Sequence, residues 1–131
     1  MDDSTLAERA LRYALETHPD AAITVLHVVG EASPFMGEAT RFALEDDFEG
    51  AVEEHAEELF AHAREIAAEY DVEIDTRVAA GRPARVIVDR ADDFDAVVIG
   101  SPAGTIVDRL FVGDTAETVF RRSPVPVTVV R

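Results

Sequence analysis

The chain has 131 residues, with 12 basic and 27 acidic side chains and a formal net charge of −15. This length fits one domain with its own core, so residues 1–131 are expected to form a single domain. The sequence has no cysteine, which excludes disulfides and thiolate chemistry. It also has no apolar run near the roughly 18 residues that a membrane span needs. The strong negative charge disfavours nucleic acid and anionic membranes as partners.

All twelve basic residues are arginines, and acidic runs such as "EDDFEG", "EEHAEE" and "RADDFD" recur along the chain. Acidic residues spread over an ordinary hydrophobic core indicate adaptation of the whole surface to high salt, where ions screen the repulsion. An acidic interaction surface is the alternative explanation. The first fifteen residues are charged and helical in pattern, unlike a signal peptide, so we expect a halophilic cytoplasmic protein.

The chain is expected to begin with a helix, followed by a buried strand. Thr5 to Glu8 reads T-x-x-E, a capping box that begins a helix, and His18-Pro19 ends this helix. The run "AITVLHVV", residues 22–29, is typical of a strand buried on both faces. Residues 30–37, "GEASPFMG", are expected to form a loop.

Residues 38–46 are ambiguous, and a long helix is expected from about Asp47 to Tyr70. The spacing of its apolar residues predicts a core stripe made of Val52, Ala56, Leu59, Ala63, Ile66 and Tyr70.

The second half of the chain continues the alternation. The run "VEIDTRV", residues 72–78, is expected to form a strand nearer an edge, and a short helix should start at Pro83. The run "DAVVIG", residues 95–100, predicts a second fully buried strand. After a glycine-containing loop, a helix is expected over Asp114 to Arg122, and "SPVPVTVVR" ends the chain with an edge strand.

This order of helices and apolar strands predicts an α/β fold, a doubly wound parallel sheet with helices on both faces. Catalytic and metal sites are weakly indicated. His55 and His62 lie seven residues apart on one helix, too far for one metal ion without outside ligands. His27 is interpreted as a satisfied core histidine. A phosphoacceptor receiver domain is largely excluded, because Val78-Ala79 stands where its aspartate would be and the chain has no lysine.

Several segments together resemble the universal stress protein family over the whole chain: "MDDSTLAERALRYAL", "TVLHVV", "AAGRPAR" and "AVVIGS…GD…RRSPVPVTVVR". The resemblance implies a Rossmann-like fold of the adenine-nucleotide alpha-hydrolase type, with five parallel strands in the order 3-2-1-4-5. The family's first strand would precede Met1, so this strand is absent from the chain as given. A start codon assigned too late, or a shortened chain, would explain this. Otherwise the central position of the sheet is empty and leaves two unpaired strand edges.

The nucleotide-binding branch of this family carries the motif G-x2-G-x9-G-[S/T]. The matching positions here are Gly100, Ala103, Gly113 and Asp114. Ala103 adds a methyl group where the backbone must approach a phosphate, although Gly104 can compensate by shifting the turn. Asp114 is expected to be the N-cap of the following helix, where its charge opposes a phosphate; Thr115 offers a hydroxyl if the cap shifts by one residue.

By the same resemblance, Asp2 matches an aspartate near the ribose or base, and Val28 and Ile99 match positions that line the adenine. Each also has a simple structural explanation: Asp2 as an acid that flanks a helix, and Val28 and Ile99 as core residues. Arg82 and Arg109 are candidates to neutralise phosphates, although exposed arginines on an acidic surface are more often ion-pair partners.

The resemblance therefore implies a stress-response protein without catalytic chemistry of its own. The first hypothesis is an ATP or AMP sensor with a degenerate phosphate loop, in which Mg²⁺ would bind only together with ATP. The alternative is a non-nucleotide-binding stress module that acts through protein contacts, and a weak ATPase is the third. A homodimer through the terminal strand, Val125–Val130, is expected in either case.

Overall fold

The computed structural model describes residues 1–30, 38–101 and 113–131, and the side-chain surroundings within them except at 38–49 and 113–114. Four helices, four strands and a short 3-10 helix alternate along these segments, as the sequence predicts. In chain order they are α1 (Thr5–Thr17), β1 (Thr24–Val29), α2 (Glu38–Glu69), β2 (Asp75–Ala80), α3 (Pro83–Arg90), η1 (Ala91–Asp93), β3 (Val97–Gly100), α5 (Gly113–Arg122) and β4 (Val127–Val130).

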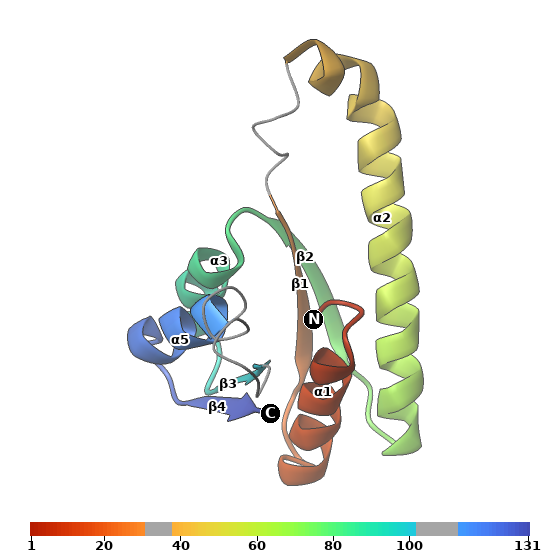
Figure 1. The fold of residues 1–131 in the computed structure, drawn as a ribbon. Coiled ribbons are helices and arrows are strands. Elements are labelled where there is room, and N and C mark those ends of the chain that lie inside the picture. The colour runs from red at the N-terminus through yellow and green to blue at the C-terminus, as the bar shows by residue number, and fades with distance from the viewer. Residues whose placement is uncertain (31–37, 102–112) are drawn as a thin grey trace.

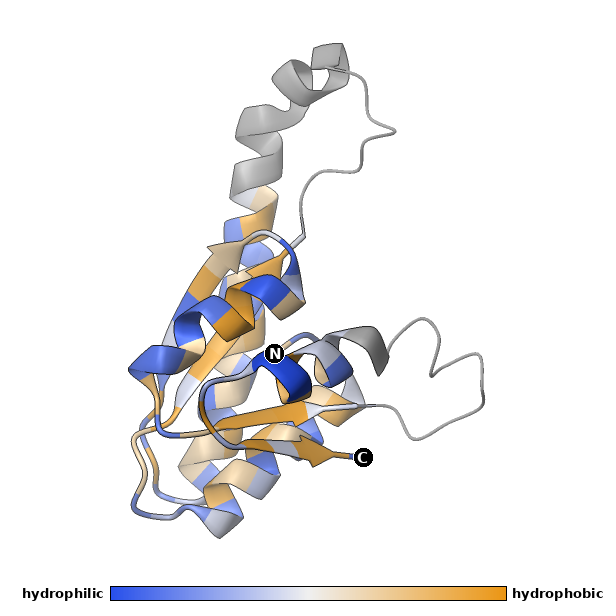
Figure 2. Ribbon diagram, turned by 90° about the vertical axis from the view of Figure 1, so that its left-hand side faces the viewer, coloured by the Kyte–Doolittle hydropathy of each residue, from blue (hydrophilic) through white to orange (hydrophobic). Residues whose placement is uncertain are grey.

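The strands form two parallel pairs, β1 with β2 and β3 with β4. Helices α1 and α2 pack together, and so do α3 and α5, so helices lie against both pairs (Figure 1). This confirms an α/β fold with parallel strands. Figure 2 shows that the two pairs run in clearly different directions and do not continue into one another as a single sheet. The described strands therefore do not establish the order 3-2-1-4-5.

The prediction that β1 and β3 are fully buried is wrong. Val25 is the one buried residue of β1, and every residue of β3 is half-buried. Within the described segments each of these strands pairs on one side alone, with β2 or with β4. A strand with one neighbour keeps part of its surface in contact with solvent, so apolar composition alone overstated the burial. No helix in the described part of the chain is long and apolar enough to cross a membrane.

The start of β2 lies three residues later than predicted, because Val72 is needed to end α2. Asp71 adopts a left-handed conformation with φ of 57°. The Asp71 N–H donates to the Ala68 carbonyl and the Val72 N–H to the Ala67 carbonyl, both at 3.1 Å. This pair of bonds is a Schellman motif, which satisfies carbonyl groups at the end of a helix. Pairing with β1 begins only at Asp75, whose N–H donates to Ile23.

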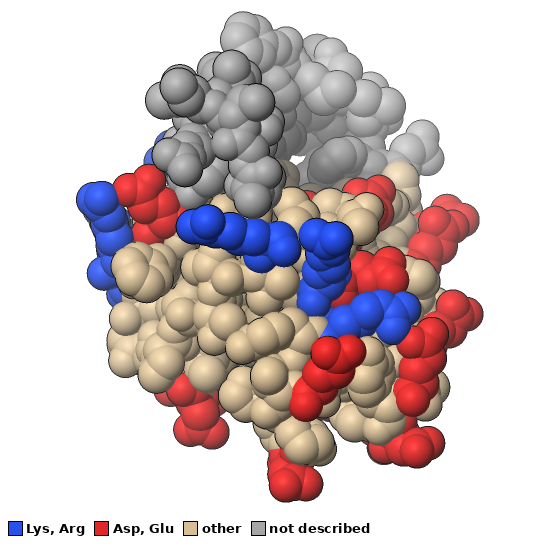
Figure 3. Space-filling model, turned by 60° about the horizontal axis from the view of Figure 1, so that its bottom comes forward, with Lys and Arg blue, Asp and Glu red and all other residues tan. Residues whose placement is uncertain are grey.

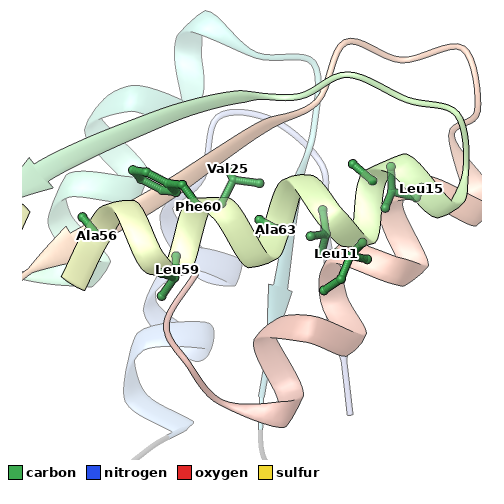
Figure 4. Packing of buried hydrophobic residues seen from close by; sticks show 9 residues of the cluster. Leu11, Leu15, Val25, Ala56, Leu59, Phe60 and Ala63 are labelled. Carbon is green, nitrogen blue, oxygen red and sulfur yellow. The ribbon is translucent and has the colours of Figure 1, made fainter. Parts of the chain in front are cut away.

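The main core lies between α1, α2 and β1 (Figure 4). Four members of the predicted stripe of α2 are buried in it: Ala56, Leu59, Ala63 and Ile66. Val52 is only half-buried, and Tyr70 packs against the cluster from its border. The remaining buried members are Leu11, Leu15, Val25, Phe60 and Ala67. Helical spacing thus located this core correctly.

Three helix starts differ from the sequence prediction. Ser4, and not Thr5, caps α1: its hydroxyl accepts the Ala7 N–H at 3.1 Å. The ambiguous residues 38–46 belong to α2. Helix α5 begins at Gly113, so Asp114 is its second residue and not its N-cap. An acid in the first turn still faces the positive end of the helix dipole.

Candidate functional site

The first six residues connect the two strand pairs. The Met1 amino group donates to the Leu26 carbonyl of β1. The Met1 carbonyl lies 2.7 Å from Nδ1 of His27 on the same strand. A few residues later, the backbone of Leu6 lies against the end of β3 at Gly100. Asp2 therefore lies on the segment that leads from β1 to the end of β3, directly after the residue that contacts β1.

Gly100 is required by this contact. A Cβ atom at this position would lie 2.8 Å from the Leu6 carbonyl oxygen and 3.0 Å from its carbon, closer than side chains approach backbone atoms. Glycine is thus needed so that α1 can pack closely on β3. The family motif explains the same residue by close approach to a phosphate, and the packing of α1 explains it equally well.

The Asp2 carboxylate is held in its charged form. Its Oδ1 accepts the Ser4 backbone N–H at 2.9 Å. Partial burial acts to raise the pKa of Asp2, but the hydrogen bonds from Ser4 and the nearby amino terminus outweigh it, and the pKa lies below its ordinary value. An ionised carboxylate is an acceptor only, and here it retains lone pairs for further donors.

Val28 and Ile99 lie one residue before the ends of β1 and β3, and both are half-buried. His27 and Val29 line a cavity whose other lining residues come from α2. Because side chains alternate along a strand, Val28 points to the opposite face, where α3 packs. Val28 is thus directed away from the α2 core.

The remaining predicted site residues are placed less completely. Gly113, Asp114 and Thr115 are the first three residues of α5, and the side chain of Thr115 is half-buried. Ala103, Gly104 and Arg109 lie outside the described residues. Arg82 is the exposed N-cap residue of α3.

A cavity of about 250 Å³ lies beside Asp2, between the start of α1 and the middle of α2. Its lining includes four carboxylates, from Asp2, Asp3, Glu8 and Glu58, together with His55 and His62. This volume is below the roughly 300 Å³ at which ligand pockets usually begin, and its charge opposes a phosphate. Among the described residues, no three histidine or acidic side chains are grouped so that they could hold a metal ion.

Comparison with known proteins identifies the family. Residues 1–131 match the sequence profile of the universal stress protein family (Usp). This chain belongs to that family. Universal stress protein MJ0531 of Methanocaldococcus jannaschii is 30% identical over 134 residues, a match that covers 99% of this chain and 78% of the relative.

Solved universal stress proteins share the fold. UspA from Lactobacillus plantarum matches with a TM-score of 0.81 at 24% identity, covering 100% of this chain and 93% of that one. A universal stress protein from Archaeoglobus fulgidus in complex with dAMP gives a TM-score of 0.68 at 23% identity, covering 100% and 92%. Another, in complex with cAMP, gives 0.65 at 26% identity, covering 99% and 90%.

The charge of this universal stress protein is divided unevenly along the chain. Residues 1–76 carry 20 acidic side chains and four arginines, whereas residues 77–131 carry seven acidic side chains and eight arginines. All the net negative charge thus belongs to residues 1–76, which contain α1, β1, α2 and their connections. Figure 3 shows one face, on which acidic side chains lie mostly around the edge of a broad uncharged area. An anionic ligand would meet less repulsion beside α3, β3 and α5 than beside α2.

Proposed function

We propose that this universal stress protein binds an adenine nucleotide beside Asp2, the ends of β1 and β3, and the start of α5. In this proposal the bound nucleotide changes what the protein contacts, so that the protein acts as a sensor. The observation that carries the proposal is that Met1 contacts β1 and Leu6 contacts Gly100, so that Asp2 belongs to the segment joining the two strand pairs. Two solved proteins of this fold, the dAMP and cAMP complexes, support the ligand class.

Each residue of the proposed site has a distinct role. The Asp2 carboxylate accepts hydrogen bonds from the ribose or the base, while Val28 and Ile99 offer apolar surface to the ring. The first turn of α5 faces the phosphate with its free N–H groups, and Thr115 adds a hydroxyl. Asp114, in the same turn, repels the phosphate. A monophosphate carries less charge than a triphosphate, so AMP is expected to bind more tightly than ATP.

The test is calorimetric titration of AMP and ATP at fixed potassium chloride, with Asp2→Asn as the variant. Loss of a hydrogen-bonding carboxylate should weaken AMP binding by about 10-fold or more. Asp3→Asn is the matched control, because Asp3 is an exposed neighbour and the change in charge is the same. Equal losses in both variants would point to general electrostatics and count against a site at Asp2.

The alternative is a stress module that binds no nucleotide and acts through protein contacts. Asp114 favours this alternative, because an acid in the first turn of α5 occupies the region in which the family motif places a serine or threonine. If neither AMP nor ATP binds at millimolar concentration, the alternative is the better description. Conversely, AMP binding that depends on Asp2 would exclude it.

We also propose that the two strand pairs belong to one sheet in the order 3-2-1-4-5, with a strand that precedes Asp2 lying between β1 and β3. Met1 supports this, since its contacts with Leu26 and His27 place it alongside β1. A chain extended upstream by six to ten mostly β-branched residues, about one strand in length, should melt at a higher temperature. Equal melting temperatures for the two chains would refute the proposed order.

A further inference from the structure

Two histidines that are distant in sequence lie together between β1 and α2. The ring centres of His27 and His55 are 6.0 Å apart, and the ring planes are inclined at 66°. His27 comes from β1 and His55 from the exposed side of α2. Spacing in the sequence relates His55 only to His62, on the same helix, and that pair needs an outside ligand to hold one metal ion. His27 is placed where such a ligand would come from.

The hydrogen bond of His27 prepares its other nitrogen for metal binding. The Met1 carbonyl can only accept, so the 2.7 Å contact requires a proton on Nδ1 of His27. In the neutral ring, Nε2 then carries a free lone pair. Metal-binding histidines usually donate their second ring N–H to a carbonyl or carboxylate in this way, which fixes the ring.

The space beside the two rings suits an ion. They line a cavity of about 250 Å³ whose other lining residues, Val29, Ala51 and Val52, are apolar. Among the described residues, the imidazoles are therefore the polar side chains that line it. A ring bound through one nitrogen has its centre about 3.2 Å from the metal, so two such rings lie about 5.2 Å apart at a tetrahedral angle and at most about 6.4 Å apart. The observed 6.0 Å lies between these two values, and a tetrahedral ion would draw the rings together by just under about 1 Å.

We propose that His27 and His55 form a two-histidine site for a divalent transition-metal ion such as Zn²⁺ or Co²⁺, with water as the remaining ligands. Imidazole ligands select these ions over Mg²⁺ and Ca²⁺, which prefer oxygen. The neighbouring carboxylates of Glu58 and Asp3, which share a second cavity with His55, raise the local concentration of cations. With two protein ligands, the site binds more weakly than a closed four-ligand zinc site.

Titration of the full chain with Co²⁺, followed by calorimetry and visible absorption, tests this proposal. We expect one ion per chain, and loss of a ligand in His55→Ala should weaken binding by at least about tenfold. His62→Ala is the matched control, since it removes another exposed histidine of α2 and should leave affinity within about twofold. Excess Mg²⁺ should not displace Co²⁺. Equal losses in the two variants, or displacement by Mg²⁺, would show binding to the acidic surface and overturn the site.

A second measurement tests the link between β1 and α2. An ion held by His27 and His55 should raise the melting temperature of the unmodified chain, because ligands stabilise the state that binds them. The rise should be absent in His55→Ala, whose exposed position on α2 makes the substitution harmless to folding. His27→Gln should behave in the same way if its circular dichroism matches that of the unmodified chain. An unchanged rise in His55→Ala would refute the proposal even if His27→Gln fails to fold.

Discussion

The role of a single residue in this protein depends on where the backbone places it, as the starts of α1 and α5 show. Thr5 has the sequence of a cap, but Ser4 is the residue that caps α1. Glu8 is consequently free of the capping box and pairs with Arg12 and His62. Asp114 is a similar case: its sequence context predicts an N-cap, but α5 starts one residue earlier.

The first prediction concerns Asp114. Replacing it with serine removes a negative charge from the first turn of α5 and completes the last position of the family motif. Nucleotide affinity should increase by about 1–3 kcal/mol, because a like charge at short range opposes the phosphate. Titration of AMP at fixed salt measures the change. Glu117→Ser, one turn further along α5, is the control and should have a smaller effect; reduced affinity in Asp114→Ser would mean that the acid assists binding.

The second prediction concerns Gly100. A methyl group at this position would lie 2.8 Å from the Leu6 carbonyl oxygen, so Gly100→Ala should lower the free energy of unfolding by about 1–3 kcal/mol. Gly50→Ala is the opposite case, since an added Cβ would meet no atom outside its own stretch of helix within 4 Å and the residue is inside α2. That change should stabilise by about 0.5–1 kcal/mol. Urea denaturation of the two variants measures both changes in the free energy of unfolding. An unchanged free energy of unfolding in Gly100→Ala would contradict the contact between α1 and β3.

At the scale of elements, polar contacts join α1 to α2 along the border of the core. Arg12 bonds to Glu69 at 2.5 Å and to Glu8 at 3.1 Å, and these bonds, chiefly the one to Glu69, raise the pKa of the guanidinium. His62 of α2 contacts Glu8 at 3.3 Å. Further along, the Tyr70 hydroxyl donates to Glu16 at 2.8 Å. These pairs are exposed, so they position the helices more than they stabilise them.

The third prediction follows from Glu8, whose pKa is lowered from 4.5 chiefly by His62 and then by Arg12. A carboxyl with a lowered folded-state pKa contributes stability above its unfolded pKa, and this contribution is lost as the pH falls through the folded value. The melting temperature of the unmodified chain should therefore fall more steeply below pH 4.5 than that of Glu8→Gln. Glu53→Gln, an exposed change on α2, should follow the unmodified chain. Parallel curves for all three proteins would contradict the role of Glu8.

At the scale of the whole molecule, two features affect stability and assembly: the uneven distribution of charge, and the strand edges that pair with no other described strand. The fourth prediction is that the melting temperature rises steeply between low and molar potassium chloride. The net charge of −15, concentrated in residues 1–76, destabilises the compact state by self-repulsion that salt screens. Scanning calorimetry over a salt series is the measurement. A flat dependence would remove the halophilic interpretation.

The fifth prediction concerns assembly through β4. The Pro126 carbonyl accepts the Val97 N–H of β3 at 2.9 Å, and the Val130 carbonyl accepts the N–H of Ser101, just after β3, at 2.8 Å. The alternate residues Val127 and Val129 therefore direct their backbone groups to the other edge of β4, which pairs with no strand in the described part of the chain. We expect a two-fold dimer in which two copies of β4 pair antiparallel. Val127→Pro removes an outward N–H without breaking the pairing with β3, and should give monomers by light scattering. Val127→Thr keeps the N–H and should remain dimeric, and a dimeric Val127→Pro would contradict this interface.

The sequence by itself determined which segments become helices and strands, and which side of α2 is buried. These properties depend on the spacing of apolar residues within one segment, as for Ala56, Leu59, Ala63 and Ile66. The resemblance to the family likewise depended on local runs, and the comparisons confirm it. The residues at which helices and strands begin and end were less predictable. Val72, for example, belongs to an alternating run typical of a strand, but its N–H bonds to the end of α2.

The tertiary structure alone decided which distant residues meet. His27 and His55 are 28 positions apart on a strand and a helix, and no periodicity relates them. Gly100 matches a phosphate-loop glycine in sequence, yet the structure shows Leu6 against it. The half-burial of β1 and β3 has the same origin, since it depends on how many neighbours a strand has. Local pattern specifies what an element can bury, whereas contacts between elements depend on how the chain brings them together in space.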